Sequence, residues 1–389
     1  MAFPLYKYYD YLNAKINKYQ RLYGDNYKKV ALKLVYWNLK FCCRLPLSLQ
    51  SFSDNMQHIL IIMSGGLGDF CFTAKYIEAL HRYLGNNTIF DIQVPKEDFY
   101  FLEYILKEKT YIQHILIDLP QKQYDAEIYI VRFPVVLSYI KKRLDEKTIQ
   151  YVYKLEKFYR ENPLIVSNDY MGRCWSLLKG QRRENQADVD NILNMSQSEF
   201  KINLPNNEDI VLSKYGLDKQ KFITIQTGAG MHFQHIKNET RQWPIEYYCE
   251  LVNILKNEYP QYKIVQLGAE YQSLCSNIDL DLRGKTAVSE LFVLLKNAKL
   301  HISQEGGMPI IRHFVKGGKS IVLFGPTDEN FFGFPENINI SARPCNNCCE
   351  WLTKDWMEKC IKTGSSADCM NSLTAETVMN EIKKCKGLD

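Results

Sequence analysis

The chain has 389 residues, 46% of them hydrophobic, so it is too long for one ordinary hydrophobic core and is expected to form two globular domains. Its net charge of +5 is small for this length, and it has no arginine-rich tract or aromatic-basic repeat, which argues against a dedicated nucleic-acid-binding protein. No apolar stretch is long enough to span a bilayer and the N-terminus has no compact signal-peptide region, so a cytoplasmic protein is predicted.

Residues 1–55 form a basic, aromatic segment with nine Lys or Arg residues and three Asp or Glu residues. Tyrosines and apolar residues are interleaved with these charges, as in an amphipathic helical arm. Such an arm packs on the body of its own chain, packs on another subunit of a homo-oligomer, or touches an anionic membrane surface such as the inner membrane. We place the two packing interpretations ahead of the membrane one.

Residues 58–85 combine a strand, a glycine turn that ends in a carboxylate, and a helix. The run Ile59–Met63 is apolar, as in a strand covered on both faces, and apolar residues then recur at helical spacing as far as Leu84. The turn Ser64–Asp69 lies between them, and its glycines permit close approach of the backbone. Because a helix N-terminus favours negative charge, Asp69 is predicted to stay ionised and to face a ligand. Simple capping of the helix is the alternative.

The rest of the first half alternates strand-like and helix-like segments. The predicted strands are Ile89–Val94, His114–Ile117 and Glu127–Val131, and the predicted helices are Asp98–Lys107 and Val135–Leu144. This alternation predicts an N-terminal Rossmann-like domain over residues 56–212, which the family resemblance given below implies to be the acceptor-side domain. The polar segment Lys179–Asp190 is expected to be an acceptor-side loop or linker, and Lys201–Leu212 a connector.

A second α/β half follows and predicts a C-terminal Rossmann-like domain over residues 213–389, which the family resemblance given below implies to be the nucleotide-sugar-binding domain. Its predicted strands are Phe222–Gln226, Lys263–Leu267, Leu300–Ser303 and Ser320–Phe324, and its predicted helices are Ile245–Asn257, Val288–Asn297 and one that runs through His313. Two doubly wound Rossmann-like domains that face a cleft form the GT-B arrangement of the α/β class. Ligands bind such sheets at the carboxyl ends of their strands.

Five of the twelve cysteines lie within residues 345–369. Disulfides are disfavoured in a reducing compartment, so this clustering indicates a metal site. Four of the five follow a C-x2-C-x11-C-x8-C pattern that suits a closed, tetrahedral and structural zinc site: Cys345, Cys348, Cys360 and Cys369. A register that uses Cys349 instead of Cys348 stays open, as does a set of reduced thiols packed in a small lobe.

Six short motifs occur in the chain between residues 65 and 328. They are Gly65-Gly66-Leu67-Gly68-Asp69, Gln226-Thr227-Gly228-Ala229-Gly230, Thr240-Arg241-Gln242-Trp243-Pro244, Asp281-Leu282-Arg283-Gly284-Lys285-Thr286, Glu305-Gly306-Gly307-Met308 and Phe324-Gly325-Pro326-Thr327-Asp328. In these motifs the chain resembles glycosyltransferase family 9, the ADP-heptose heptosyltransferases of bacterial lipopolysaccharide and related surface glycans. The resemblance covers roughly residues 58–385.

This resemblance implies an inverting transfer of heptose from ADP-heptose, without a catalytic metal, to a hydroxyl of a surface glycan or a protein. Asp69 would take the proton of the acceptor hydroxyl, and Arg241 would stabilise the departing diphosphate. The donor nucleotide sugar would be bound by Gly66, Gly68, Thr227, Gly228, Gly230, Glu305, Gly306, Gly307, Met308, Gly325 and Thr327.

The chain departs from the family pattern at two places. Met308 and Pro309 stand where a histidine usually follows the glycine pair, with Arg312 and His313 further on, and Glu305 replaces a more usual aspartate. The cysteine-rich insertion at residues 343–370 is similar to the iron-binding finger of the autotransporter heptosyltransferases, which modify protein serines, so iron is the alternative to zinc. A transferase for another nucleotide sugar, an epimerase, and a noncatalytic partner for a glycan or an assembly are the other functions considered.

Overall fold

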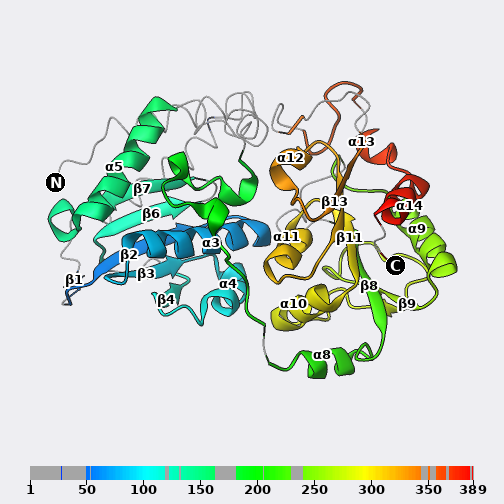
Figure 1. Ribbon diagram of the computed structural model, residues 1–389. Helices are drawn as coiled ribbons and strands as arrows, with labels where there is room; N and C mark the ends of the chain where they lie inside the picture. The colour runs from blue at the N-terminus through cyan, green and yellow to red at the C-terminus, as the bar shows by residue number, and fades with distance from the viewer. Residues whose placement is uncertain are drawn as a thin grey trace. The chain divides into compact units, whose positions relative to one another are not determined.

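The computed structural model describes residue 28 and residues 50–52, 54–118, 122–130, 133–162, 181–204, 206–228, 240–342, 349–350, 356–364, 368–385 and 388 (Figure 1). The predicted arm over residues 1–55 therefore lies almost entirely outside the described residues. The described residues fall into two compact units: those within 28–65, 72–162 and 183–198 form the first, and those within 66–71, 181–182 and 199–388 form the second. Among the described residues, no helix has the length and apolar character needed to cross a membrane.

The first unit is built on a five-stranded sheet in the order β4-β3-β2-β6-β7. Its strands are β2 (Gln57–Met63), β3 (Thr88–Gln93), β4 (Ile112–Leu116), β6 (Ala126–Ile130) and β7 (Pro134–Tyr139), beside a two-stranded pair of β1 (Gln50–Ser51) and β5 (Lys122–Gln123). Its helices are α3 (Leu67–Leu84), α4 (Phe99–Leu106) and α5 (Glu146–Glu161), with short 3-10 turns at Lys96–Asp98, Lys141–Arg143, Arg183–Asn185, Val189–Asn191 and Met195–Gln197. The strand and helix predicted around the glycine turn are confirmed, since every residue of β2 is buried and α3 follows directly.

The prediction of a helix over Val135–Leu144 is wrong. Residues Pro134–Tyr139 form β7, which pairs antiparallel with β6, and the helix α5 begins only at Glu146. Valines and tyrosine suit a strand better than a helix because their χ1 freedom is limited. Pro134 is tolerated because it is the first residue of an edge strand, where a missing backbone N–H costs little.

The second unit is built on a six-stranded parallel sheet in the order β10-β9-β8-β11-β12-β13. The strands are β8 (Lys221–Gln226), β9 (Tyr262–Gln266), β10 (Leu280–Asp281), β11 (Leu300–Gln304), β12 (Ser320–Phe324) and β13 (Ile338–Ser341). The helices are α8 (Glu208–Lys214), α9 (Ile245–Glu258), α10 (Val288–Asn297), α11 (Gly307–Phe314), α12 (Glu329–Phe332), α13 (Asp368–Asn371) and α14 (Ala375–Lys384). The predicted strands and helices of this half are confirmed, whereas α8 begins inside the segment expected to be a connector.

Helices cover both faces of this second sheet, with α9 and α14 on one side and α10 and α11 on the other (Figure 1). The α9–α14 side buries Trp243, whose indole Nε1 donates to the carbonyl of Leu373 at 2.6 Å and whose ring packs edge-on against Tyr248 at 4.5 Å. Burial of aromatic rings of this size is a major source of stability. Trp243 thus holds the segment that follows Arg241 against the core.

Candidate functional site

Asp69 lies in the first turn of α3, directly after the central strand β2. The chain reverses at Gly65, whose φ of 147° is one that side chains rarely adopt. Gly66 precedes the helix and donates its backbone N–H to Asp69 Oδ2 at 3.1 Å, while Gly68 is buried in the first turn. This bond is a capping interaction. A carboxylate has two oxygens and about four lone-pair sites, so capping through Oδ2 is compatible with a second role as a base.

The topology of the second sheet brings four predicted or neighbouring segments to one edge. The chain runs outward from β8 to β9 and β10 and then returns to β11 on the other side of β8, so the strand order reverses between β8 and β11. Thr227 follows β8, Glu305 follows β11, Gly325 follows β12 and Gly268 follows β9. Ligands of doubly wound sheets bind at the carboxyl ends of the strands at such a reversal. We call these carboxyl ends of β9, β8, β11 and β12 the carboxyl edge.

Three of the predicted residues meet at this edge. Arg241 Nη2 donates to Glu305 Oε2 at 2.5 Å and to the Glu305 carbonyl at 3.1 Å, and Thr327 Oγ1 donates to the same Oε2 at 3.3 Å. The side chains of Arg241 and Glu305 are only 14% and 11% exposed. Arg241, Glu305 and Thr327 come from three separate motifs. Glu305 therefore orients the guanidinium of Arg241, the group that can donate paired hydrogen bonds to phosphate oxygens.

Gly325 allows the end of β12 to approach the segment that carries Arg241. A Cβ at Gly325 would lie 2.6 Å from the carbonyl oxygen of Thr240, closer than real contacts permit. Thr240 is itself held by a bond of 2.9 Å from its Oγ1 to the carbonyl of Trp356. A glycine at this position therefore has a packing cause in the structure, and the donor-binding role of Gly325 stays a prediction.

Thr227 belongs to a second polar cluster at the same edge, which includes residues that the sequence analysis did not single out. Thr227 Oγ1 donates to the carbonyl of Ser273 at 2.6 Å, and Gln266 Nε2 donates to both Thr227 Oγ1 at 3.0 Å and Ser273 O at 2.7 Å. Gln272 fills the space beside Gly228, where a Cβ would lie 2.8 Å from its Cγ. Gln266 is the last residue of β9, whose sequence Tyr-Lys-Ile-Val-Gln is that of an ordinary strand, so no signal in the sequence marked it.

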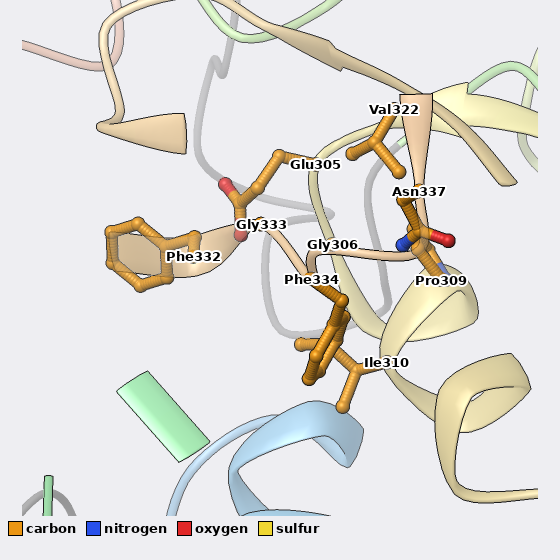
Figure 2. Close-up of a pocket in the computed structure, with 9 residues that line it drawn as sticks. All are labelled: Glu305, Gly306, Pro309, Ile310, Val322, Phe332, Gly333, Phe334 and Asn337. Carbon is orange, nitrogen blue, oxygen red and sulfur yellow. The ribbon is translucent and has the colours of Figure 1, made fainter. Parts of the chain in front are cut away.

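A small cavity lies beside Glu305 (Figure 2). It is lined by Glu305, Gly306, Pro309, Ile310, Val322, Phe332, Gly333, Phe334 and Asn337. Figure 2 shows residues from the end of β11, the start of α11 and the segment after α12 around it. Its volume of about 10 Å³ suits about one water molecule. It is therefore a niche next to Glu305 and too small to be a complete sugar-nucleotide site.

The residues that follow the glycine pair have structural roles. Gly306 and Gly307 lead into α11, and Met308 is buried in its first turn. Arg312 is fully buried and donates to the carbonyls of Leu295 and Ala298 at the end of α10, and this burial lowers the pKa of Arg312 to about 10. The ring of His313 stacks on Phe334 with centroids 3.8 Å apart. Arg312 and His313 therefore have packing roles of their own, and neither takes the place of the histidine that usually follows the glycine pair in the family.

Gly230, predicted to bind the donor, lies outside the described residues. So do Cys345 and Cys348 of the predicted metal site. Among the described residues, no three His, Cys, Asp or Glu side chains are grouped closely enough to hold a metal ion. Burial raises the pKa of Cys360, but hydrogen bonds from Thr363 and the backbone N–H of Lys362 outweigh it, so its pKa is lowered overall. This environment suits a thiolate ligand. The metal site stays a prediction.

Comparisons with known proteins establish the fold. Neither a protein-family model nor a curated protein sequence matches this chain. The ADP-heptose lipopolysaccharide heptosyltransferase II of E. coli is similar in structure, with a TM-score of 0.53 and 13% identity over 84% of this chain and 98% of that one. A family 9 glycosyltransferase from Veillonella parvula gives a TM-score of 0.51 and 13% identity over 85% and 99%.

A third similar structure is the dodecameric, iron-containing heptosyltransferase TibC from enterotoxigenic E. coli, in complex with ADP-D-β-D-heptose. It gives a TM-score of 0.57 and 13% identity over 84% of this chain and 76% of that one. The α/β fold expected for the GT-B class is thereby confirmed. The resemblance to glycosyltransferase family 9 is confirmed at the level of the fold.

Proposed function

We propose that this chain is an inverting glycosyltransferase of family 9 that transfers heptose from ADP-heptose to a hydroxyl group. The observation that carries the proposal is that Arg241, Glu305 and Thr327 meet at the carboxyl edge. These three residues come from three separate motifs. A partly buried guanidinium held by a carboxylate at the carboxyl edge of a doubly wound sheet suits a nucleotide diphosphate.

The chemistry assigns one role to each of two residues. Asp69 accepts the proton of the acceptor hydroxyl as its oxygen attacks the anomeric carbon of the donor sugar. The bond from that carbon to the diphosphate oxygen breaks, and ADP leaves with the electron pair. Arg241 stabilises the negative charge that develops on the leaving diphosphate. Attack on the face opposite the leaving group inverts the anomeric configuration.

Helix N-termini and glycine turns contribute the remaining donor contacts in this proposal. Backbone N–H groups at Gly306 and Gly307 open α11 and favour phosphate oxygens, as do those of the turn at Thr227 and Gly228. ADP-heptose is the proposed donor because TibC, which shares the fold, was found in complex with ADP-D-β-D-heptose. A surface glycan of the lipopolysaccharide type or a protein is the proposed acceptor, and a cytoplasmic location is part of the proposal.

A structural metal at the cysteine cluster accompanies this proposal but takes no part in the transfer. Cys345, Cys348, Cys360 and Cys369 would hold one zinc or iron ion, which would stabilise the lobe that contains them. TibC contains iron, which supports assaying iron alongside zinc.

The first experiment is calorimetric titration of the purified chain with ADP and ADP-heptose beside UDP- and GDP-sugars. Selective binding of the adenine ligands supports the proposal. Preference for another nucleotide assigns a different donor to the same site. If none of the nucleotides binds, the proposed transferase activity is contradicted, and a noncatalytic partner for a glycan or an assembly becomes the favoured function.

The second experiment tests the base with Asp69→Asn and a matched control, Asp209→Asn. Asp209 is also an acidic residue in the first turn of a helix, α8, but it is exposed. We expect Asp69→Asn to retain folding and ADP binding and to lose at least about 100-fold in turnover, the range of general-base catalysis. Asp209→Asn should leave turnover unchanged. Full activity of Asp69→Asn would exclude Asp69 as the base.

A further inference from the structure

Two cysteine sulfurs lie in contact in the second unit, outside the cysteine cluster and outside every sequence motif. The thiol of Cys275 donates to the sulfur of Cys249, with 3.2 Å between the two Sγ atoms. Cys249 lies near the start of α9 and is half-buried, while Cys275 is buried in the segment between β9 and β10. A disulfide bond has an S–S length of about 2.05 Å, so an approach of little more than 1 Å would join the two sulfurs.

The surroundings of the pair divide the chemistry between its members. Cys249 Sγ accepts hydrogen bonds from the Cys275 thiol and from the backbone N–H of Ser276 at 3.3 Å. Burial raises the pKa of Cys249, but the hydrogen bonds from Ser276 and Cys275 outweigh it and lower its pKa overall. Burial raises the pKa of Cys275 above its ordinary value. Cys249 is thus the more accessible and more nucleophilic sulfur, and Cys275 is placed behind it as a resolving thiol.

The segment that carries Cys275 is bonded to the turn at Thr227. The backbone N–H of Cys275 donates to Gln266 Oε1 at 2.8 Å, and Gln266 Nε2 donates to Thr227 Oγ1 at 3.0 Å. Thr227 in turn donates to the carbonyl of Ser273, two residues before Cys275, at 2.6 Å. A displacement of Cys275 toward Cys249 is therefore transmitted to Thr227 through one side chain.

We propose that Cys249 and Cys275 are a redox-active thiol pair that peroxide oxidises to a disulfide, and that this disulfide weakens nucleotide binding at the Thr227 turn. The effect on nucleotide binding rests on the proposed function, whereas the oxidation of the thiol pair does not. The Cys249 thiolate attacks one peroxide oxygen, the O–O bond breaks, and a sulfenic acid and one water form after protonation. The Cys275 thiol then attacks the sulfenic sulfur and releases a second water. Each sulfur loses one electron and each peroxide oxygen gains one.

The test treats the full chain with hydrogen peroxide, blocks the remaining thiols with an alkylating agent, and maps the peptides by mass spectrometry without reduction. We expect a Cys249–Cys275 cross-linked peptide that dithiothreitol removes. Cys249→Ser and Cys275→Ser should each abolish it. Cys385→Ser, at another half-buried thiol, should retain it. The proposal that the two cysteines are a redox-active pair is overturned if both thiols can still be alkylated after peroxide treatment, or if Cys249 is oxidised without this cross-link.

The coupling is tested by titrating the reduced and the oxidised chain with ADP. We expect the dissociation constant for ADP to rise at least threefold on oxidation and to recover with dithiothreitol, while Cys249→Ser shows no change with peroxide. Cross-linking with unchanged ADP affinity overturns the coupling. If ADP binds neither form, the proposed function fails, and the cross-linked peptide still decides whether the thiol pair is redox-active.

Discussion

The pair of Arg241 and Glu305 provides the sharpest energetic test of the candidate site. Its atoms Nη2 and Oε2 are 2.5 Å apart, and its side chains are 14% and 11% exposed, so water screens the pair weakly. A hydrogen bond to a charged group contributes about 1.5–3 kcal/mol to the free energy of unfolding. Removing only the guanidinium adds the cost of a carboxylate left without this partner, about 1–3 kcal/mol. Arg241→Met should therefore lower the free energy of unfolding by about 2.5–6 kcal/mol.

A double-mutant cycle isolates the interaction from other effects of each substitution. The cycle combines Arg241→Met with Glu305→Gln and is measured by urea unfolding, with the midpoint and slope fitted for each variant. We expect a coupling free energy of about 2 kcal/mol, because Glu305→Gln leaves a neutral amide that tolerates the loss of Arg241. A coupling below about 0.5 kcal/mol would refute the inference that Glu305 holds the guanidinium in place.

A matched control comes from the same unit. Lys256 and Asp279 form an ion pair of similar length, 2.7 Å, but their side chains are 25% and 32% exposed. Exposed pairs contribute about 0.2–1 kcal/mol, so the cycle of Lys256→Met with Asp279→Asn should give a clearly smaller coupling than the Arg241 cycle. For ligand binding, Arg241→Met should weaken ADP at least about tenfold, whereas Lys256→Met should leave it unchanged.

Three further predictions follow from packing, charge and metal chemistry. Gly325→Ala should lower the free energy of unfolding by about 1–3 kcal/mol because its Cβ meets the Thr240 carbonyl, whereas Gly306→Ala, whose Cβ meets nothing closer than 3.9 Å, should unfold like the parent chain in urea. A hydrogen bond from Arg283 lowers the pKa of Asp281 to about 2, so the stabilisation from the ionised carboxylate is present above about pH 4 and is lost as the pH falls toward 2. In Arg283→Met the urea midpoint should therefore depend less on pH between about pH 4 and pH 2 than in the parent chain. An unchanged pH dependence of the midpoint would contradict the role of Arg283. Cys360→Ser should abolish the zinc or iron measured by elemental analysis in the purified chain, whereas a parent chain without either metal would remove the predicted site.

Much of the second unit was predictable because its pattern is local. The strands β8 and β12 are apolar and are flanked by glycine or polar residues, and the helix α10 is apolar at the helical period, so the sequence bounds agree closely with the structural ones. β7 was not predictable in this way, because a short apolar run has no period that distinguishes a strand from a helix. Pairing with β6 decided its conformation.

The candidate site shows the same division. The motifs placed Glu305 directly after a strand, Asp69 in the first turn of a helix, and Arg241 and Thr327 in turns that precede helices, and such positions are readable from the chain alone. The roles of Gln266 and of Arg312 were not readable. One ends an ordinary strand and the other lies in an ordinary helix, and only packing shows that Gln266 joins Thr227 to Cys275 and that Arg312 binds the end of α10.

Most strands and helices, the glycine turns that follow strands, and the residue types available for a diphosphate and a general base could be predicted from the amino-acid sequence. These depend on short-range properties: hydrophobic period, backbone freedom at glycine, and charge near a helix end. The tertiary structure alone decided which distant residues meet. The Arg241–Glu305 contact joins residues 64 positions apart, because parallel strands and their crossovers bring separate loops to one edge of a sheet. The Cys249–Cys275 contact joins residues 26 apart, because the segment after β9 packs on the helix α9.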